Sequence, residues 1–152
     1  MTARELIRDS LATYNWSGDA YRLEDLAETF CEDGELEIRG RDPLQGREAI
    51  VGFLGRHTEQ GDDESRRAAL AAASAARGLR RIVRHTLTNV RFLELVPDQA
   101  RVASYFTVFT EVGLDHYGRY RDTFVPVGDE WLIRHRYVST DWRSPTSTMA
   151  PA

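Results

Sequence analysis

The hydrophobic positions in the first part of the chain repeat with the period of an α-helix. Ile7, Leu11 and Tyr14 recur at helical spacing behind Thr2 and Glu5, which have the form of a capping box, and Gly18 ends this helix. A second helix, stopping at Asp33-Gly34, is predicted from apolar residues spaced i, i+3, i+4, i+7 and i+8: Leu23, Leu26, Ala27, Phe30 and Cys31. A third is predicted from a similar set: Ile50, Val51, Phe53, Leu54 and His57.

The rest of the pattern is typical of β-strands. A short strand is expected over 35–39, and from residue 82 onward β-branched and aromatic residues are interrupted by turn residues. These turns separate four long predicted strands, at 82–95, 100–112, 116–127 and 130–141. Because short turns make neighbouring strands antiparallel, the pattern predicts helices followed by an antiparallel meander, which is an α+β fold.

Two segments do not fit this pattern. Residues 61–78 are polar and then alanine-rich, which favours a helical extension or a flap. The end of the chain, 144–152, is rich in proline, serine and threonine and is predicted to be a flexible or loosely docked tail. The length of 152 residues fits one domain, which we expect over 1–143.

Composition excludes several classes of function. All 20 basic residues are arginine, so Schiff-base chemistry and phosphate-binding loops that need a lysine are excluded. The net charge of −4 lacks the positive field of a nucleic-acid-binding protein. The chain has no long apolar run for a membrane span or a signal peptide, so we expect a cytoplasmic protein with no membrane partner.

The cysteine and histidine inventory argues against a metal. Cys31 is the only cysteine, so it forms no internal disulfide and no thiolate cluster, and we expect a buried, unreactive thiol in the second helix. The four histidines, His57, His85, His116 and His135, show no metal-ligand spacing. We therefore expect neither a metal nor another cofactor.

Three residues are candidates for acid/base chemistry, and each also has a purely structural interpretation. Strand alternation places His85 on one face with Val83, Leu87 and Asn89, where it is either a proton-transfer group or a hydrogen-bonded core residue. Asp19 either orients a catalytic group or caps the second helix. Tyr14 is either a proton donor or a core aromatic residue.

The order of elements, taken together with several short signatures, resembles the nuclear transport factor 2-like superfamily. The similarity extends from the first helix to Trp142 and is greatest to the SnoaL-like, scytalone-dehydratase-like and bile-acid-dehydratase-like branch. The signatures are Tyr14 with Asp19, residues 30–34, residues 46–50, Arg84-His85 with Asn89, residues 118–122, and Trp131 with Arg136.

The resemblance implies three helices packed on a strongly curved antiparallel sheet, which forms a cone-shaped barrel around an apolar pocket. It implies that Tyr14, Asp19 and His85 are catalytic, although the strand after His85 carries Ser104, Tyr105 and Phe106 and no second histidine. The residues assigned to substrate binding are Asn89, Tyr120, Asp122 and Arg136. The other sheet face commonly packs in dimers in this superfamily, so a homodimer or higher homo-oligomer is expected.

The function that fits is a cofactor-independent lyase or isomerase of the dehydratase type, acting on a small hydrophobic, cyclic substrate. Asp19 would fix the tautomer of His85, His85 would take a proton next to a carbonyl, and Tyr14 would donate to the enolate oxygen. Alternatives are a polyketide-type cyclase using Asp122, which otherwise pairs with an arginine, and a non-catalytic ligand-binding or dimerisation module. A limonene-epoxide hydrolase is disfavoured, since it needs arginine and aspartate two residues apart, whereas Arg121 and Asp122 are adjacent.

Overall fold

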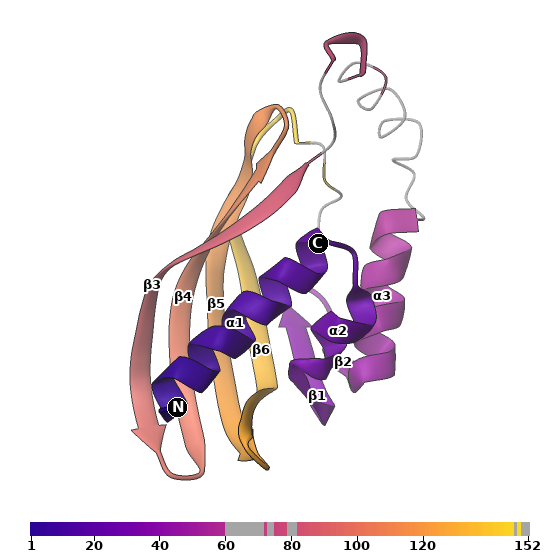
Figure 1. Ribbon diagram of the computed structural model, residues 1–152. Helices are drawn as coiled ribbons and strands as arrows, with labels where there is room; N and C mark the ends of the chain where they lie inside the picture. Colours follow the sequence, from indigo (N-terminus) through magenta and orange to yellow (C-terminus); the bar gives the residue numbers. More distant parts are fainter. Residues whose placement is uncertain (60–71, 73–74, 79–81, 148, 150–152) are drawn as a thin grey trace.

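The computed structural model describes residues 1–59, 72, 75–78, 82–147 and 149. Three helices lie on one side of a strongly curved sheet (Figure 1): α1 (Ala3–Asp19), α2 (Leu23–Glu28) and α3 (Arg47–Glu59). The strands are β1 (Phe30–Ile38), β2 (Leu44–Gln45), β3 (Val83–Val96), β4 (Gln99–Thr110), β5 (Gly113–Val127) and β6 (Glu130–Arg143). The predicted α+β class is confirmed, and α1 begins with the capping box of Thr2 and Glu5.

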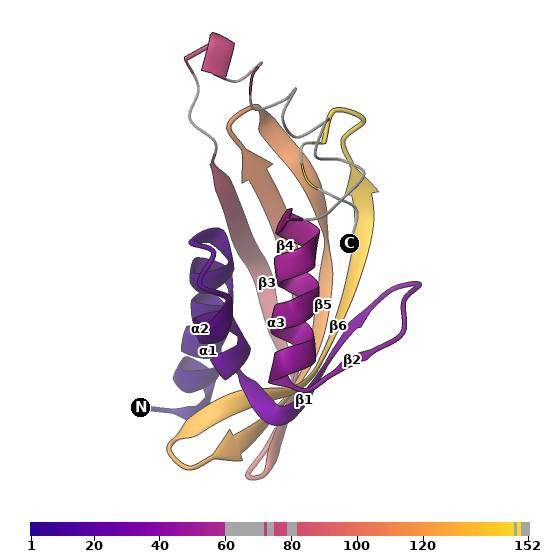
Figure 2. The ribbon, with the colours of Figure 1, turned by 90° about the vertical axis from the view of Figure 1, so that its right-hand side faces the viewer.

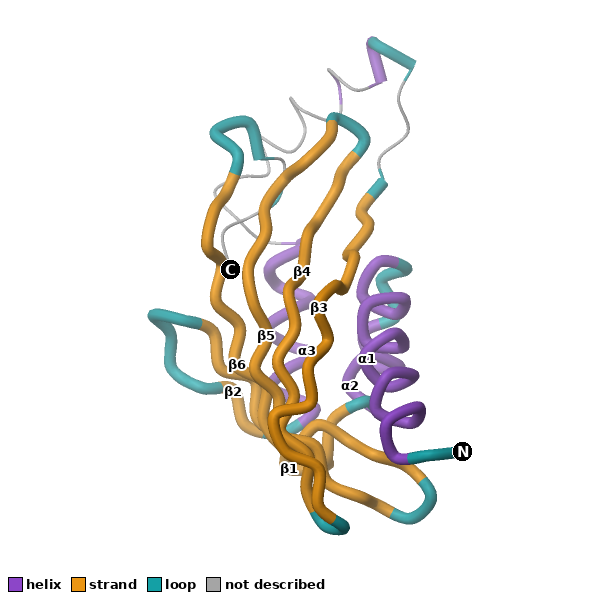
Figure 3. Tube along the Cα trace, turned by 90° about the vertical axis from the view of Figure 1, so that its left-hand side faces the viewer, coloured by secondary structure: helices purple, strands orange, loops and turns teal. Residues whose placement is uncertain are grey.

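The sheet has six strands in the order β2-β1-β6-β5-β4-β3. The four long strands form the expected antiparallel meander, but β1 pairs parallel with β6, so the sheet is mixed. Its edge strands, β2 and β3, do not pair with each other, so the sheet is curved but does not close into a barrel. Figures 2 and 3, taken from opposite sides, show the helices covering only one face of the sheet, which we call the inner face.

The second helix is shorter than its apolar spacing predicts. It ends at Glu28, and Phe30 already pairs with Ile133 of β6, whose backbone N–H donates to the carbonyl oxygen of Thr29 at 2.8 Å. Pairing with a central strand therefore overrides the helical pattern at Phe30 and Cys31. Cys31 lies in β1, not in a helix, and burial raises the pKa of its thiol, in keeping with the expected buried thiol.

The core lies between the inner face of the sheet and the helices. Ile7 and Leu11 of α1 and Ile50 of α3 pack against Phe30 and Ile133, and all five side chains are almost completely buried. Helix α1 packs against β3, and its last residue, Asp19, contacts His85 near the beginning of that strand. No helix among the described residues is long and apolar enough to cross a membrane.

The two segments outside the pattern have different outcomes. Most of 61–78 falls outside the described residues, so its helix or flap stays a prediction. The described part of the tail is docked: the Ser144 N–H donates to the Asp115 carbonyl oxygen at 2.7 Å, and Ser147 is buried. Ser147 Oγ also donates to Asp115 Oδ1 at 2.8 Å, so the described residues 144–147 contact β5, and the flexible or loosely docked tail over 144–152 stays a prediction.

Candidate functional site

Asp19 and His85 form a hydrogen-bonded pair across 66 positions of sequence. His85 Nδ1 lies 2.6 Å from Asp19 Oδ1, and the backbone N–H of His85 donates to Asp19 Oδ2 at 2.9 Å. The expected contact is thus confirmed as geometry, and its use in catalysis stays a prediction. Asp19 is the last residue of α1, whereas α2 is preceded by Arg22 with no side-chain cap, so the helix-capping interpretation of Asp19 is wrong.

The double contact fixes the histidine in one orientation. An ionised carboxylate only accepts hydrogen bonds, so Nδ1 of His85 carries the hydrogen, and the lone pair lies on Nε2. The side chains of His85 and Asp19 keep 21% and 12% of their surface exposed, which leaves the pair accessible at the rim of the core.

Arg136 lies deeper, against two tyrosine rings that meet edge to face with an interplanar angle of 74°. Its guanidinium carbon is 4.1 Å from the ring centre of Tyr14 and 4.2 Å from that of Tyr120. Its Nε and Nη2 atoms each donate to one carboxylate oxygen of Asp122 at 2.8 Å, and neither side chain is exposed. The arginine-pairing interpretation of Asp122 therefore describes the structure, and Tyr14 is a partner of Arg136 in the core.

The charges of this cluster affect one another strongly. Burial alone would lower the pKa of the Arg136 guanidinium, but the charge and hydrogen bonds of Asp122 offset this, so the pKa lies above its ordinary value. Burial raises the pKa of Tyr14, although Arg136 opposes it. Burial is also the largest cause of the raised pKa of Tyr120, to which Asp19 adds a smaller share. The charge and hydrogen bonds of Asp122 are therefore what keep the buried Arg136 guanidinium charged.

Two polar atoms of this region have no hydrogen-bond partner among the described residues. They are Nη1 of Arg136 and Oγ of Ser104, both buried. Ser104 is the register partner of Tyr120, so both atoms belong to the same part of the inner face. Buried polar atoms without partners are rare, and a water or a ligand oxygen commonly satisfies them.

Asn89 is not where strand alternation placed it. The register between β3 and β4 shifts between Thr88 and Arg91, and Asn89 has a left-handed backbone with φ of 53°. This β-bulge interrupts the alternation, and the side chain of Asn89 is exposed. Asparagine tolerates this conformation better than most residues. The structure therefore separates Asn89 from the inner-face residues with which it was grouped.

A second pair of an aspartate and a histidine lies on β5. Asp115 Oδ1 is 2.7 Å from His116 Nδ1, and both side chains are buried. The sequence pattern did not reveal this pair, because Asp115 falls between the predicted strands 100–112 and 116–127, and His116 was considered only as a metal ligand. An aspartate followed directly by a histidine at the start of a strand is the sequence signal for this pair. It indicates a contact between the two side chains only when the strand register is known.

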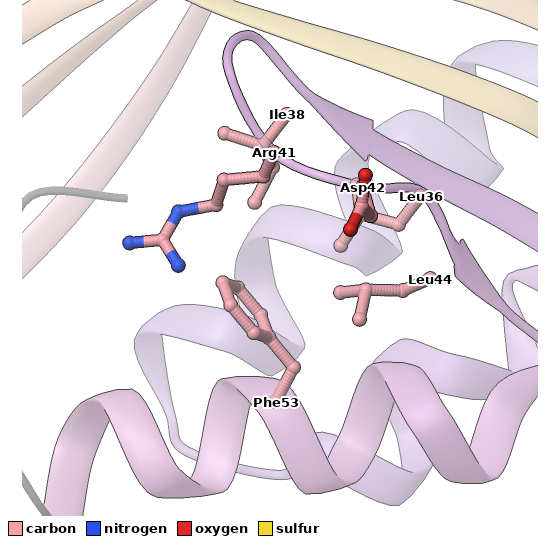
Figure 4. A pocket seen from close by; sticks show the side chains of 6 residues that line it. All are labelled: Leu36, Ile38, Arg41, Asp42, Leu44 and Phe53. Carbon is pink, nitrogen blue, oxygen red and sulfur yellow. The ribbon is translucent and has the colours of Figure 1, made fainter.

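A cavity of about 190 Å³ lies apart from the Asp19–His85 pair (Figure 4). It lies between β1, the loop that follows it and α3, and its lining residues are Leu36, Ile38, Arg41, Asp42, Leu44 and Phe53. Leu36 is the register partner of Arg136, so this cavity lies on the β1 side of the arginine, whereas His85 lies on the β3 side. The cavity does not include the Asp19–His85 pair.

Three residues among those described are close enough to be possible metal ligands. Ligand atoms of Glu35, Glu37 and His135 lie within 4.8 Å of one another, and His135 Nε2 is 2.9 Å from Glu37 Oε2. All three side chains are partly exposed, and the contacts describe a histidine between two carboxylates on neighbouring strands. Hydrogen bonding accounts for this grouping without an ion.

The chain belongs to the SnoaL-like domain family, whose model matches residues 1–137. Among solved structures, a protein from Catenulispora acidiphila in complex with S-DNPA is 25% identical, with a TM-score of 0.71 over 91% of this chain and 92% of that one. A putative scytalone dehydratase from Novosphingobium aromaticivorans is 21% identical, with a TM-score of 0.70 over 93% and 85%.

ActVI-ORFA from Streptomyces coelicolor is 19% identical, with a TM-score of 0.69 over 91% of this chain and 96% of that one. No curated protein matches the chain. The expected nuclear transport factor 2-like fold is thereby confirmed, since a structural neighbour with this fold aligns with a TM-score of 0.68. Likeness at these identities supports the fold, and the family includes several kinds of chemistry.

Proposed function

We propose that this protein is a cofactor-independent lyase or isomerase of the dehydratase type, acting on a small, hydrophobic, cyclic carbonyl compound. The observation that carries the proposal is the Asp19–His85 pair, with Nδ1 and Oδ1 2.6 Å apart and the backbone N–H of His85 bound to the other oxygen. An imidazole fixed in this way presents an unprotonated Nε2 as a general base. The putative scytalone dehydratase among its structural neighbours supports this class of reaction.

In this mechanism His85 Nε2 removes the proton from the carbon next to the carbonyl. The electron pair moves onto the carbonyl oxygen as an enolate, and Asp19 stabilises the imidazolium that forms. The enolate then either expels a β-hydroxyl, which takes the proton from the His85 imidazolium and leaves as water, or, in a β,γ-unsaturated substrate, is reprotonated by that imidazolium at the γ carbon, which moves the double bond. Both outcomes balance without an oxidant or reductant.

Tyr14, Arg136 and Asp122 have linked roles in the proposal. The Tyr14 hydroxyl donates to the enolate oxygen, and Arg136 behind its ring supplies positive charge. Asp122 holds that arginine with both carboxylate oxygens. Tyr120 contacts the same guanidinium and the edge of Tyr14, and the unpartnered Ser104 hydroxyl is a further hydrogen-bond donor.

Hydrogen exchange tests the proposal without knowledge of the natural substrate. The probe is 2-tetralone in D₂O, with a set of cyclic β-hydroxy ketones beside it, and proton NMR follows loss of the signal next to the carbonyl. His85→Ala should lower the enzymatic exchange rate by about 10²- to 10⁴-fold, the usual contribution of a positioned proton-transfer group. Asp19→Asn should also lower the rate, and Tyr14→Phe should lower it less.

His135→Ala is the matched control, because His135 is a partly exposed histidine on the outer face, opposite the helices. It should leave exchange unchanged. An unchanged rate in folded His85→Ala would reject the histidine base. Absence of exchange for the whole probe set with the wild-type protein would instead favour a non-catalytic ligand-binding module.

The cyclase alternative depends on Asp122 as the base, and its environment disfavours that role. Both oxygens of Asp122 accept hydrogen bonds from Arg136, and its side chain is not exposed. Arg121, its neighbour in sequence, is exposed, so the two do not share a face as the epoxide-hydrolase arrangement requires. We therefore assign Asp122 to positioning Arg136.

We also propose that the protein is a cytoplasmic homodimer formed through the outer face of the sheet. This face carries exposed aromatic side chains: Tyr105, Phe109, Tyr117 and Trp142, of which 40 to 50% of the surface is accessible. Tyr117 and Trp142 stack with ring centres 5.5 Å apart, and Tyr117 pairs with Thr107 of β4, which lies between Tyr105 and Phe109 in sequence. Apolar patches of this kind on a sheet face are typical of subunit interfaces.

A further inference from the structure

Asp115 and His116 are consecutive in β5, yet both side chains are buried. In a regular strand, neighbouring side chains point to opposite faces. Here Val108 pairs with His116 and Phe109 with Leu114, so Asp115 is the extra residue of a β-bulge. Bulges occur beside active sites, where they redirect a side chain. The bulge is what allows an aspartate to contact the ring of the histidine that follows it.

His116 lies in the same row of the sheet as His85. Val108 of β4 pairs with His85 on one side and with His116 on the other. Directly paired residues project from the same face, and strands are about 4.8 Å apart, so the two histidine backbones are separated by roughly 10 Å. His85 also contributes to the pKa of His116, which agrees with their proximity.

The surroundings of His116 leave one nitrogen available as an acceptor. Asp115 Oδ1 binds Nδ1 at 2.7 Å, accepts a hydrogen bond from Ser147 Oγ at 2.8 Å, and lies 3.6 Å from Arg143 Nη1. Nδ1 of His116 therefore carries the hydrogen, and Nε2 carries the lone pair. Nε2 has no hydrogen-bond partner among the residues that the structure describes.

The charges around His116 keep its ring neutral near pH 7. Burial lowers the pKa of His116, Arg143 and His85 lower it further, and the hydrogen bond and charge of Asp115 oppose them. A neutral ring with this tautomer accepts a hydrogen bond at Nε2 and does not donate one.

Two aromatic rings that are almost completely buried lie next to His116. The His116 and Phe106 rings meet edge to face with centres 5.9 Å apart, and Phe106 stacks on Tyr120 at 4.6 Å. Gly118 makes this packing possible: a Cβ there would lie 2.9 Å from the Phe106 ring and collide with the backbone of β6. Planar rings pack favourably against other aromatic rings in offset or edge-to-face arrangements.

We propose that His116 is a substrate-binding residue whose Nε2 accepts a hydrogen bond from a hydroxyl group of the substrate. The inference rests on the proposed function, and it specifies the substrate class as a planar or partly aromatic ring compound that carries a hydroxyl group. His85 acts on the carbon next to the carbonyl of the substrate. His116, two strands away in the same row, binds the hydroxyl group of the substrate. Ser147 and Arg143 position the acceptor through Asp115.

A pair of probes that differ only in the hydroxyl hydrogen tests the proposal. The probes are 2-naphthol and 2-methoxynaphthalene, titrated by fluorescence against the wild-type protein. Wild type should bind the naphthol about 2- to 13-fold more tightly than the ether, the range for one net hydrogen bond. His116→Phe keeps an aromatic ring but removes the acceptor, so it should abolish this preference. His135→Phe, on the outer face, should retain it.

Asp115→Asn is a second variant that leaves the imidazole in place. An asparagine amide donates to Nδ1, which moves the ring hydrogen to Nε2 and removes the acceptor there, so the naphthol preference should also fall. Equal binding of the two probes by wild type, or an unchanged preference in either variant, would overturn the proposal.

The outcome is distinguishable from failure of the proposed function. If the preference disappears in His85→Ala and persists in His116→Phe, the acceptor is His85 and the inference is wrong. If wild type shows no exchange next to any carbonyl but keeps a naphthol preference that depends on His116, the proton-abstraction function fails and the binding role of His116 stands.

Discussion

Replacing Asp122 by asparagine should test how the core holds its buried charge. The variant keeps the shape of the side chain but removes the negative charge that both Nε and Nη2 of Arg136 contact at 2.8 Å. Arg136 and Asp122 have no exposed side-chain surface, so water cannot solvate the guanidinium that is left behind. Breaking a buried pair by removing one partner typically costs about 3 to 5 kcal/mol.

That magnitude is large enough for a simple measurement. With an m-value of about 2 kcal/mol/M, a loss of about 3 to 5 kcal/mol lowers the urea midpoint by roughly 1.5 to 2.5 M. Asp33→Asn is the control, because Asp33 and Arg134 make a pair at 2.7 Å with about half or more of each side chain exposed. Exposed pairs contribute at most about 1 kcal/mol.

A double variant separates charge from packing. Arg136→Met with Asp122→Asn removes the charge of both partners, so its loss of stability should be smaller than the sum of the two single losses. Arg136→Met alone should also lose the contacts with the rings of Tyr14 and Tyr120. If Asp122→Asn lowers the urea midpoint no more than Asp33→Asn does, the predicted cost of leaving the buried Arg136 charge unpaired is refuted.

Two other predictions concern pH and assembly. Folding lowers the pKa of His116 from its ordinary 6.5, so the unfolded chain binds more protons than the folded one between the folded and unfolded pKa values, and the free energy of unfolding should fall as pH falls through about 6.5. His116→Gln should reduce this dependence on pH in urea titrations between pH 7.5 and 5. Equal slopes for wild type and variant would contradict a lowered pKa of His116. Light scattering should give twice the monomer mass for wild type, and Trp142→Arg with Phe109→Arg should give the monomer, whereas Trp16→Arg, on the exposed side of α1, should stay dimeric. A wild-type monomer at micromolar concentration would reject the outer-face interface.

The sequence by itself determined the elements whose signals are local. The capping box of Thr2 and Glu5 and the spacing of Ile7, Leu11 and Tyr14 define α1, because caps and helical faces depend on residues only a few positions apart. Turn residues likewise separate the strands of the meander. The placement of His85 on the inner face follows from simple alternation, which holds from Val83 to Leu87.

Only the tertiary structure decided what depends on partners distant in sequence. Helix α2 ends early because Phe30 pairs with β6, and the parallel pairing of β1 with β6 has no local signature. The bulges at Asn89 and Asp115 are also set by register, which turns one side chain outward and the other inward.

The candidate site divides in the same way. Tyr14, Asp19 and His85 were identifiable as residue types in order, but the 2.6 Å contact between Asp19 and His85 required the packing of α1 against β3. The resemblance assigned Arg136 to substrate binding, and the sequence did not show which aspartate it pairs with. Folding pairs it with Asp122, since a guanidinium without exposed surface needs a charged partner at hydrogen-bond distance, and a substrate contact through its remaining Nη1 atom stays a prediction.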